Sequence, residues 1–242
     1  PEAMKIALLC PVRERMELNN ILIRSLLTTI GDYKNVDLFF GVDEDDVETK
    51  NALEKYSEYI PWIKVVVFLK QDKFPGVGYL WNTMAMKLIE NFVDTYEIVG
   101  MIGNDMVFKT PSWDLKIIEE FENHKDNKIL MVHCEDGNQH GRVAVNSFIH
   151  SNYIKFTGYY VREEFKVDYI DTWLHQVHLS LGCCIFRPDI LIQHNHWSFG
   201  KAKRDHIANR MIVTDGGESR NLWNTLAPIR IKEIEYLKTQ LK

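Results

Sequence analysis

The sequence has few cysteines and no apolar stretch long enough to cross a membrane. Cys10, Cys134, Cys183 and Cys184 show neither the Cys-x-x-Cys spacing of a zinc site nor the density of a disulfide scaffold. The longest apolar runs, such as residues 63–69, fall far short of the roughly 20 residues of a membrane span. We therefore expect reduced thiols, a cytoplasmic location and no membrane partner, with oxygen and imidazole groups as the ligands for any metal.

The sequence also lacks an excess of positive charge and a signal-like start. A formal net charge of -5 gives no long-range attraction to nucleic acid. Lys201, Lys203 and Arg204 form a local basic cluster that fits either a phosphate contact or a solvated helix start. Residues 1–3 lack the basic and apolar segments of a signal peptide, so we expect a cloning remnant, with Met4 as the native start.

Apolar runs of strand length alternate with segments of helical spacing along the first hundred residues. The expected strand–helix pairs are residues 4–10 with 14–30, 36–42 with 47–59, and 63–69 with 79–93. This alternation predicts an α/β fold with a mainly parallel central sheet flanked by helices. The length fits a single domain, with a smaller region appended to it.

The alternation loosens beyond residue 113. We expect a helix to about residue 123, a strand at 129–133, a helix at 171–181, short strands near 184 and at 190–193, and a polar C-terminal helix after 215. The loop at 135–138, which includes Asp136, is rich in turn-forming residues and is expected on the acceptor side.

Asp105 is the strongest candidate for binding a metal ion. A strand at residues 98–102 precedes it, and open α/β sheets bind ligands at the carboxyl ends of their strands. A carboxylate there suits Mn²⁺ or Mg²⁺, and the amide of Asn104 adds a second oxygen or a ribose contact. An Asn-Asp pair is also ordinary turn chemistry, so a simple turn is the alternative.

Two histidines near the end of the chain are candidates for the same ion. His194 and His196 alternate along a strand end, so only one is expected to face the site. Manganese accepts mixed oxygen and imidazole ligands, which favours His196 and leaves His194 open. The glycine-lysine loop that follows includes Lys201, which we expect to contact phosphate.

Asp171 is the candidate general base. It lies with Asp168 around the start of a predicted helix, where a carboxylate either caps free amides or is held ionised to accept a proton. The nucleotide end of a ligand is expected near Arg13 and Asp43, because a carboxylate accepts hydrogen bonds from a base and an arginine reaches ribose or phosphate. The acids that follow Asp43 are more typical of a solvated helix start.

The order of these segments, over residues 5–205, resembles the GT-A glycosyltransferases, especially small family 2-like enzymes of bacteria and their phages. Residues 10–15 look like that family's Pro-Thr-Arg-Gly-Arg segment, 41–46 like its acidic base-binding turn, 75–82 like its Pro-Gly and Trp-Asn pairs, 169–173 like its Asp-Thr-Trp segment, and 193–202 like its closing histidine and loop. Residues 103–114 are the most specific match, to an acidic metal motif followed by Thr-Pro-Gly-Trp. Asn104 departs from it, since an acid is common there.

The resemblance implies a metal-dependent transfer of a sugar from a UDP- or GDP-linked donor to an acceptor hydroxyl, by inversion, with Mn²⁺ or Mg²⁺ as cofactor. It implies a bacterial cell or phage-infected host, and an acceptor that is a glycan or a hydroxymethylated DNA base. The expected donor contacts are Pro11, Arg13, Asp43, Asn82, Asn104 and Lys201. Asp105, His196 and His194 are expected at the metal, Asp171 as base, and Asp136 with Trp173 at the acceptor.

Residues 4–242 are then one GT-A domain, divided into a nucleotide-sugar half (4–110), an acceptor half (111–214) and a C-terminal arm (215–242). A nucleotidyltransferase is one alternative, but its phosphate loop after the first strand is usually rich in glycine, and residues 11–15 contain none. A non-catalytic binding protein is another, motivated by Asn104. The oligomeric state stays open.

Overall fold

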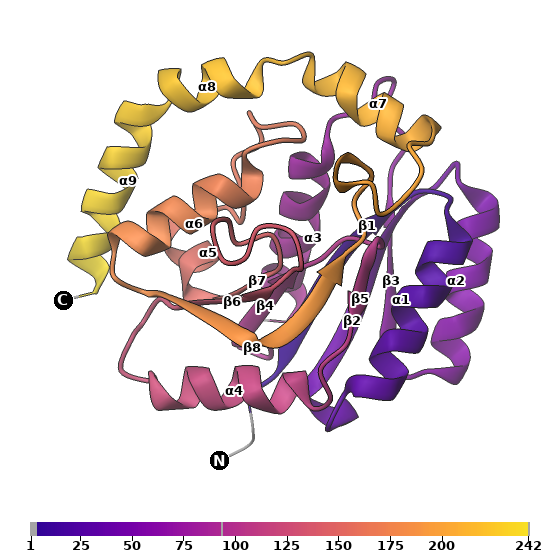
Figure 1. The fold of residues 1–242 in the computed structure, drawn as a ribbon, viewed down its shortest axis with the longest axis horizontal. Helices are drawn as coiled ribbons and strands as arrows, with labels where there is room; N and C mark the ends of the chain where they lie inside the picture. Colours follow the sequence, from indigo (N-terminus) through magenta and orange to yellow (C-terminus); the bar gives the residue numbers. More distant parts are fainter. Residues whose placement is uncertain (1–3, 93, 242) are drawn as a thin grey trace.

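The computed structural model describes residues 4–92 and 94–241, and an eight-stranded sheet runs through its centre (Figure 1). The expected cloning remnant at residues 1–3 lies outside the described residues. The strands are β1 (Ile6–Val12), β2 (Val36–Asp43), β3 (Ile63–Phe68), β4 (Ile98–Met101), β5 (Met106–Phe108), β6 (Met131–Glu135), β7 (Ser147–His150) and β8 (Cys184–His194). Their order across the sheet is β3-β2-β1-β4-β7-β6-β8-β5.

Helices cover both faces of this sheet. They are α1 (Met16–Thr29), α2 (Val47–Tyr59), α3 (Val77–Asn91), α4 (Trp113–Asn123), α5 (Asn152–Thr157), α6 (Ile170–Ser180), α7 (His206–Asp215), α8 (Ser219–Thr225) and α9 (Ala227–Gln240), with 3-10 turns at Tyr33–Asn35 and Trp197–Phe199. Within the described residues, no helix combines the length and apolar character that a membrane crossing requires.

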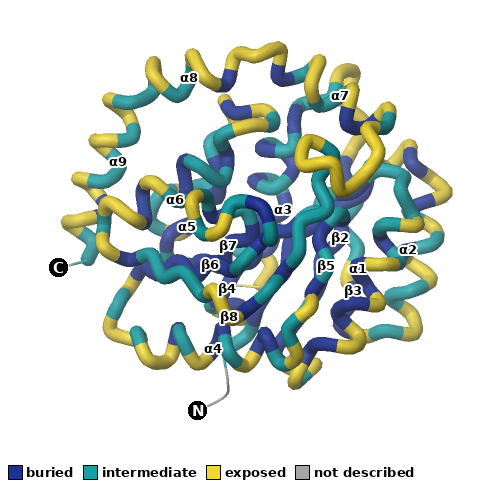
Figure 2. Tube along the Cα trace, viewed as in Figure 1, coloured by how far each residue is buried: buried dark blue, intermediate teal, exposed yellow. Residues whose placement is uncertain are grey.

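Alternation along β1 shows how the two faces become separate cores. Ile6, Leu8 and Cys10 pack into the cluster that includes α1, α2 and α4, whereas Ala7 and Leu9 pack into the cluster that includes α3, α5 and α6. Successive side chains of a strand point to opposite faces, so a fully apolar strand requires cover on both. Figure 2 shows the result, with buried strands inside and exposed turns of helix outside.

The predicted α/β fold with a mainly parallel sheet is confirmed. The strands β3, β2, β1 and β4 are parallel neighbours, and β6 is parallel to β8. The antiparallel pairs are β4 with β7, β7 with β6, and β8 with β5. The first four strands therefore end at one edge of the sheet, where Asp105 follows β4.

Beyond β4, the strands differ from the sequence expectation. The two short strands predicted near 184 and at 190–193 are one long strand, β8, whose pairing with β6 shifts register after Cys134. The short strands β5 and β7 were not predicted, because three or four residues are too few to show a period. The predicted helix end at residue 93 lies outside the described residues.

The C-terminal region holds three helices where one was predicted. The helices α7, α8 and α9 form an arc around the outer edge of the molecule, ending beside α6 (Figure 1). Gly216 and Gly217, both with positive φ, separate α7 from α8, so the break was recognisable but the helix before it was not. The first residues of α7 then return to the strand ends that form the site.

Candidate functional site

A cavity of about 250 Å³ opens at the carboxyl ends of β1 and β4. Six of the predicted site residues line it: Pro11, Asn104, Asp105, Asp171, His194 and His196. They come from β1, the loop after β4, the first turn of α6 and the end of β8. Residues almost two hundred positions apart are thus gathered around one space.

Asp105 is held on one wall by its own loop and by β8. A Cβ built on Gly103 would lie 2.7 Å from Asp105 Oδ1, so only glycine leaves room for this carboxylate. The backbone N–H of Asn195 donates to the Asp105 carbonyl at 2.9 Å, and β5 pairs Met106 with His194. Asp105 Oδ2 lies 3.2 Å from His194 Nε2.

The Asp105–His194 pair keeps both partners in their charged forms. Burial acts to raise the pKa of Asp105, but the hydrogen bond and positive charge of His194 outweigh it, and the net effect is a lowered pKa. Burial likewise acts to lower the pKa of His194, and Asp105 outweighs it, so the net pKa is raised. Asp105 is therefore a carboxylate over a wide pH range, as a metal ligand must be.

His196 lines the same cavity as His194, and the expected separation onto opposite faces is not found. Their ring centroids lie 5.1 Å apart. The reason is that β8 ends at His194, so strand alternation no longer applies to His196. His196 Nδ1 lies 2.7 Å from the Ser198 hydroxyl, and burial and then His194 lower the pKa of His196.

Oxygen and imidazole groups on this wall fit a hard or borderline divalent cation. Asp105, His194 and His196 are not a complete set of closely spaced ligands. Among the residues that the structure describes, the three ligand atoms that all lie within 4.8 Å of one another belong to other residues, elsewhere in the fold. Asp105, His194 and His196 would thus supply part of a coordination sphere. Phosphate oxygens and water commonly complete such a site.

Asp171 also lines this cavity, from the first turn of α6. The residue before this helix is Tyr169 in a left-handed conformation, so Asp171 is not the N-cap residue. Its Oδ1 accepts hydrogen bonds from the Thr172 N–H at 2.7 Å and the Thr172 hydroxyl at 3.2 Å. In the described part of the chain no ion pair involves Asp171, and burial raises its pKa. The neighbouring Asp168 also has a raised pKa, through burial and then Asp215.

The loop between β8 and α7 closes one side of the cavity. Arg15 and Asp205 form a bidentate ion pair, with Arg15 Nε 2.7 Å from Asp205 Oδ2, and Asp205 also caps α7. Lys203 lines the cavity, whereas Lys201 points away and donates to the Gly137 carbonyl at 2.8 Å. The predicted phosphate contact from this loop is therefore better placed at Lys203.

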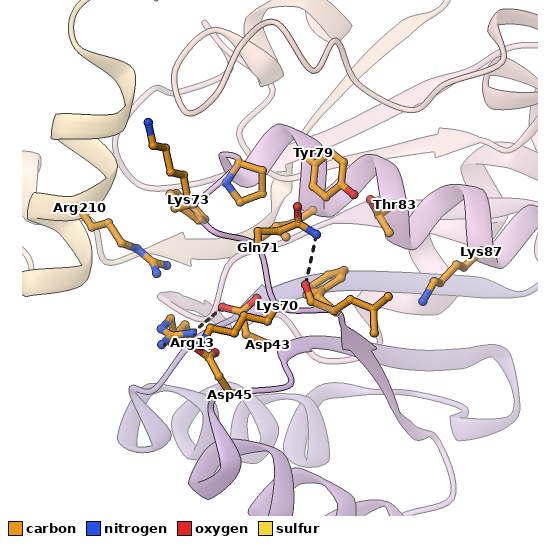
Figure 3. Close-up of a pocket in the computed structure, with 15 residues that line it drawn as sticks. Arg13, Asp43, Asp45, Lys70, Gln71, Lys73, Tyr79, Thr83, Lys87 and Arg210 are labelled. Atoms are coloured by element: carbon orange, nitrogen blue, oxygen red, sulfur yellow. Dashed lines mark hydrogen bonds and ion pairs between the residues drawn. The ribbon is translucent and has the colours of Figure 1, made fainter.

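A second cavity, of about 340 Å³, lies beyond the ends of β2 and β3. Its charged rim consists of Arg13, Asp43, Asp45, Lys70, Lys73, Lys87 and Arg210 (Figure 3). Arg13 Nη1 lies 2.8 Å from Asp43 Oδ2 and 2.6 Å from Asp45 Oδ1. The hydrogen bond from Arg13 lowers the pKa of Asp45. A small pocket shares Arg13 and Asp43 with this cavity and Asn104 with the first, so the two are neighbours.

Four predicted site residues line neither cavity, namely Lys201 and three others. Asn82 is buried, where it donates to Glu163 at 2.6 Å and accepts from the Tyr160 N–H at 2.7 Å. Trp173 is fully buried in the core of α6, and Asp136 is buried with its Oδ1 accepting from the N–H groups of its own loop. The adjacent Trp81 faces the first cavity instead, with its indole N–H on the Leu9 carbonyl.

The glycine turn before α3 has a packing role. A Cβ on Gly76 or Gly78 would lie 2.7 Å or less from the backbone of Lys166 or Phe165. The Lys166 carbonyl accepts the Val77 N–H at 2.7 Å. This turn therefore holds α3 against the loop before α6, which carries Asp168. Arg210 and Met211 of α7 also line the cavities, but nothing local in the sequence marks them.

The sheet order and the site at its strand ends define the GT-A fold of glycosyltransferases, and comparison with solved structures confirms this part of the resemblance. Residues 1–349 of TarS from S. aureus match with a TM-score of 0.57 and 15% identity, covering 78% of this chain and 59% of that one. A mannosyltransferase from Pyrobaculum calidifontis, solved with GDP-Man and Mn²⁺, matches with a TM-score of 0.61 and 10% identity, covering 97% of this chain and 74% of that one.

GalNAc-T7, solved with UDP, GalNAc and Mn²⁺, is similar with a TM-score of 0.59 and 9% identity, covering 80% of this chain and 44% of that one. The chain thus spans less than two thirds of the TarS fragment and of GalNAc-T7. No known family profile and no curated protein sequence matches it. At these identities the likeness establishes the fold, and the chemistry must be argued from the site.

Proposed function

We propose that this chain is a metal-dependent glycosyltransferase that moves a sugar from a nucleoside-diphosphate donor to an acceptor hydroxyl. One observation carries the proposal. In a single cavity, a charged carboxylate lies with two imidazoles, and a second carboxylate has no ion-pair partner in the described part of the chain. The first arrangement suits binding of a cation and a diphosphate, and the second suits removal of a proton.

The neighbouring cavity accommodates the nucleoside end of the donor. Asp43 can accept a hydrogen bond from a base, and Arg13, which Asp43 and Asp45 hold, can reach ribose or phosphate. The small pocket that adjoins both cavities then carries the diphosphate past Pro11 and Asn104 toward Asp105. Lys203 and Arg15 lie where they would meet the phosphate charge.

Asp105 and the neutral imidazole of His196 would hold Mn²⁺ or Mg²⁺, and His194 would join them where the ion displaces its proton. The ion, when bound, supplies positive charge that stabilises the leaving diphosphate. Asp105 keeps its negative charge through the reaction because its pKa is lowered. Asn104 donates to the Asn19 side chain at 2.9 Å, which leaves its carbonyl oxygen turned to the donor as a further contact.

Asp171 acts as the base. It takes the proton from the acceptor hydroxyl while that oxygen attacks the anomeric carbon, and the bond from this carbon to the diphosphate oxygen breaks with its electron pair. Direct displacement of this kind inverts the configuration. A raised pKa makes Asp171 a better proton acceptor than a fully solvated aspartate.

The donor is a UDP- or GDP-linked sugar, and the acceptor is a glycan or a hydroxymethylated DNA base. Similar structures were solved with UDP-GlcNAc and with GDP-Man, which supports both donor classes. Residues 4–110 form the donor half of one domain, 111–214 the acceptor half and 215–242 an arm. Asp136 and Trp173 support the acceptor half from beneath the surface, since both are buried.

Calorimetry with UDP- and GDP-sugars, in the presence of Mn²⁺ or a chelator, followed by mass spectrometry of acceptor mixtures, tests the proposal. We expect metal-dependent donor binding and an acceptor mass increased by one sugar residue. An increase by a nucleotide would identify a nucleotidyltransferase instead. Donor binding without any product across glycan and DNA acceptors would indicate a binding protein.

A further inference from the structure

A second group of metal-type side chains lies away from both cavities. His133 on β6, His175 on α6 and Cys184 on β8 each offer one ligand atom, and these atoms all lie within 4.8 Å of one another. None of the three lines the donor cavities. Cys184 begins β8 and His194 ends it, so the two groups stand at opposite ends of this strand.

Strand register explains why these residues meet. In the parallel pair of β6 and β8, Met131 lies opposite Cys184, and His133 lies opposite Phe186. Met131 and His133 are two residues apart, so they share a face, and Cys184 belongs to that face as well. Helix α6 packs on it and brings His175 over the strands. The cluster therefore depends on three elements that are far apart in the sequence.

His133 is a buried polar group in need of a partner. Its side chain is almost fully buried, and its Nδ1 has no hydrogen-bond partner among the residues that the structure describes. The rings of His175 and Phe186 each lie 5.0 Å from it. Leaving a buried nitrogen without a hydrogen bond is destabilising, so a bound ligand at this point would be stabilising.

We propose that His133, His175 and Cys184 bind a zinc-class divalent cation. Two imidazoles and a thiolate are ligands that Zn²⁺ prefers, and three protein ligands leave a fourth position for water. Zinc bonds of about 2.0–2.3 Å place neighbouring ligand atoms about 3.3–3.8 Å apart, so closure requires movements of at most about 1.5 Å. Because His175 and Cys184 are only partly buried, the ion can enter from solvent.

His133 is already in the protonation state that metal binding requires, whereas Cys184 must lose a proton. Burial and then the neighbouring His175 lower the pKa of His133 to about 4, so its imidazole is neutral, as a ligand must be. Burial raises the pKa of the Cys184 thiol to about 11. Binding therefore replaces the thiol proton by the metal ion and releases that proton to solvent.

The bound ion would join β6, β8 and α6. His175 lies one turn after Asp171 on α6, so fixing His175 also restrains the helix turn that lines the donor cavity. The bound ion would thus be a structural crosslink next to the part of the cavity that Asp171 lines. Its test does not depend on the proposed sugar transfer, because metal binding is measured directly.

Cobalt provides a direct readout, since Co²⁺ bound to a thiolate gives a charge-transfer absorption in the near ultraviolet. Reduced, chelator-treated protein should bind one Co²⁺ per chain with this band, and excess Zn²⁺ should displace it. Zn²⁺ should also raise the melting temperature. Cys184→Ser should abolish the band, and His175→Gln should weaken Co²⁺ binding by more than the roughly 10- to 100-fold loss typical when only a supporting residue is removed.

Two matched variants separate this site from others. Cys183→Ser removes the adjacent thiol, which bonds the Leu181 carbonyl, and should keep the band. Asp105→Ala removes the donor-site carboxylate and should keep it too. The proposal is overturned if the folded wild-type protein shows no thiolate band, if Cys184→Ser retains it, or if Cys183→Ser loses it. Melting curves without metal establish that each variant is folded, and His175→Gln, at a partly exposed position, tests the site without changing the strands.

Discussion

Two carboxylates that line the first cavity have the same chemistry but lie in opposite electrostatic settings. Asp105 has an imidazole 3.2 Å away, and its pKa is lowered in spite of burial. Among the described residues only Thr172 donates a hydrogen bond to Asp171, and burial raises the pKa of Asp171 in spite of the charge of His194. The difference teaches that a cation partner, more than burial, decides whether a buried carboxylate holds charge or accepts a proton.

Replacing Asp171 by asparagine tests whether this carboxylate accepts the proton. Asp171→Asn keeps the shape and the acceptor oxygen for Thr172, but it cannot take a proton. Turnover should fall roughly 10²- to 10⁴-fold, with donor affinity and melting temperature almost unchanged. Steady-state kinetics, calorimetry and a melting curve on one sample measure all three. Asp168→Asn is the matched control; normal turnover in Asp171→Asn with loss in Asp168→Asn would move the base to Asp168.

Removing Asp105 tests whether the other carboxylate, which stays charged, supports metal-dependent donor binding. Asp105→Ala should lose metal-supported donor affinity by about 10- to 100-fold, the size expected for a lost charged contact. Calorimetry with Mn²⁺ and with a chelator measures the difference. Asp189→Asn changes a surface carboxylate paired with Arg187 and should have no effect. Equal donor affinity with and without metal in the wild-type protein would contradict the assignment of Asp105.

Comparing variants of the two imidazoles tests which histidine beside Asp105 binds the metal ion. We expect His196→Ala to weaken metal-supported donor binding several-fold more than His194→Ala. The pKa of His196 is lowered, which leaves a neutral ring, whereas His194 is already engaged with Asp105. Titration of Mn²⁺ at constant donor compares the two variants. The reverse ranking would assign the ligand to His194, and negligible effects in both would remove histidine from the metal site.

Glu233 on α9, outside the cavity, is a third carboxylate whose pKa shift can be tested. It accepts hydrogen bonds from Tyr153 and Tyr159, yet burial raises its pKa from 4.5 to about 7. Its stabilising contribution is therefore full below about pH 4.5 and is lost as the pH rises through about 7. Relative to Glu233→Gln, the wild-type free energy of unfolding should fall by about 2–3 kcal/mol between these limits.

Urea unfolding at both ends of this pH range measures that change. Glu235→Gln, two residues along the same helix on an exposed side, is the control and should show no such trend. A constant difference between the wild type and Glu233→Gln at all pH values would mean that Glu233 titrates as an ordinary glutamate. Donor binding should be unaffected in Glu233→Gln, because the raised pKa of Glu233 is not by itself evidence of a role in binding.

The donor half of the fold could be read from the sequence because its strands are apolar, of ordinary length and separated by single helices. Asp105 and Asp171, predicted from their positions at a strand end and a helix start, line one cavity, and their roles stay predictions. Asn82 and Trp173 are buried and line neither cavity, because helical spacing alone does not say which face packs into the core. The strands β5 and β7 were missed because they are too short to show a period.

The sequence by itself determined the order of strands and helices and the polar residues at the strand ends. Both are local properties, and parallel strands necessarily end at one edge of their sheet. Only the tertiary structure decided that His194 meets Asp105, that Asp205 reaches Arg15, and that His133, His175 and Cys184 converge. These contacts depend on the register of β5 and β6 against β8 and on how α6 and α7 pack, which no single stretch of sequence encodes.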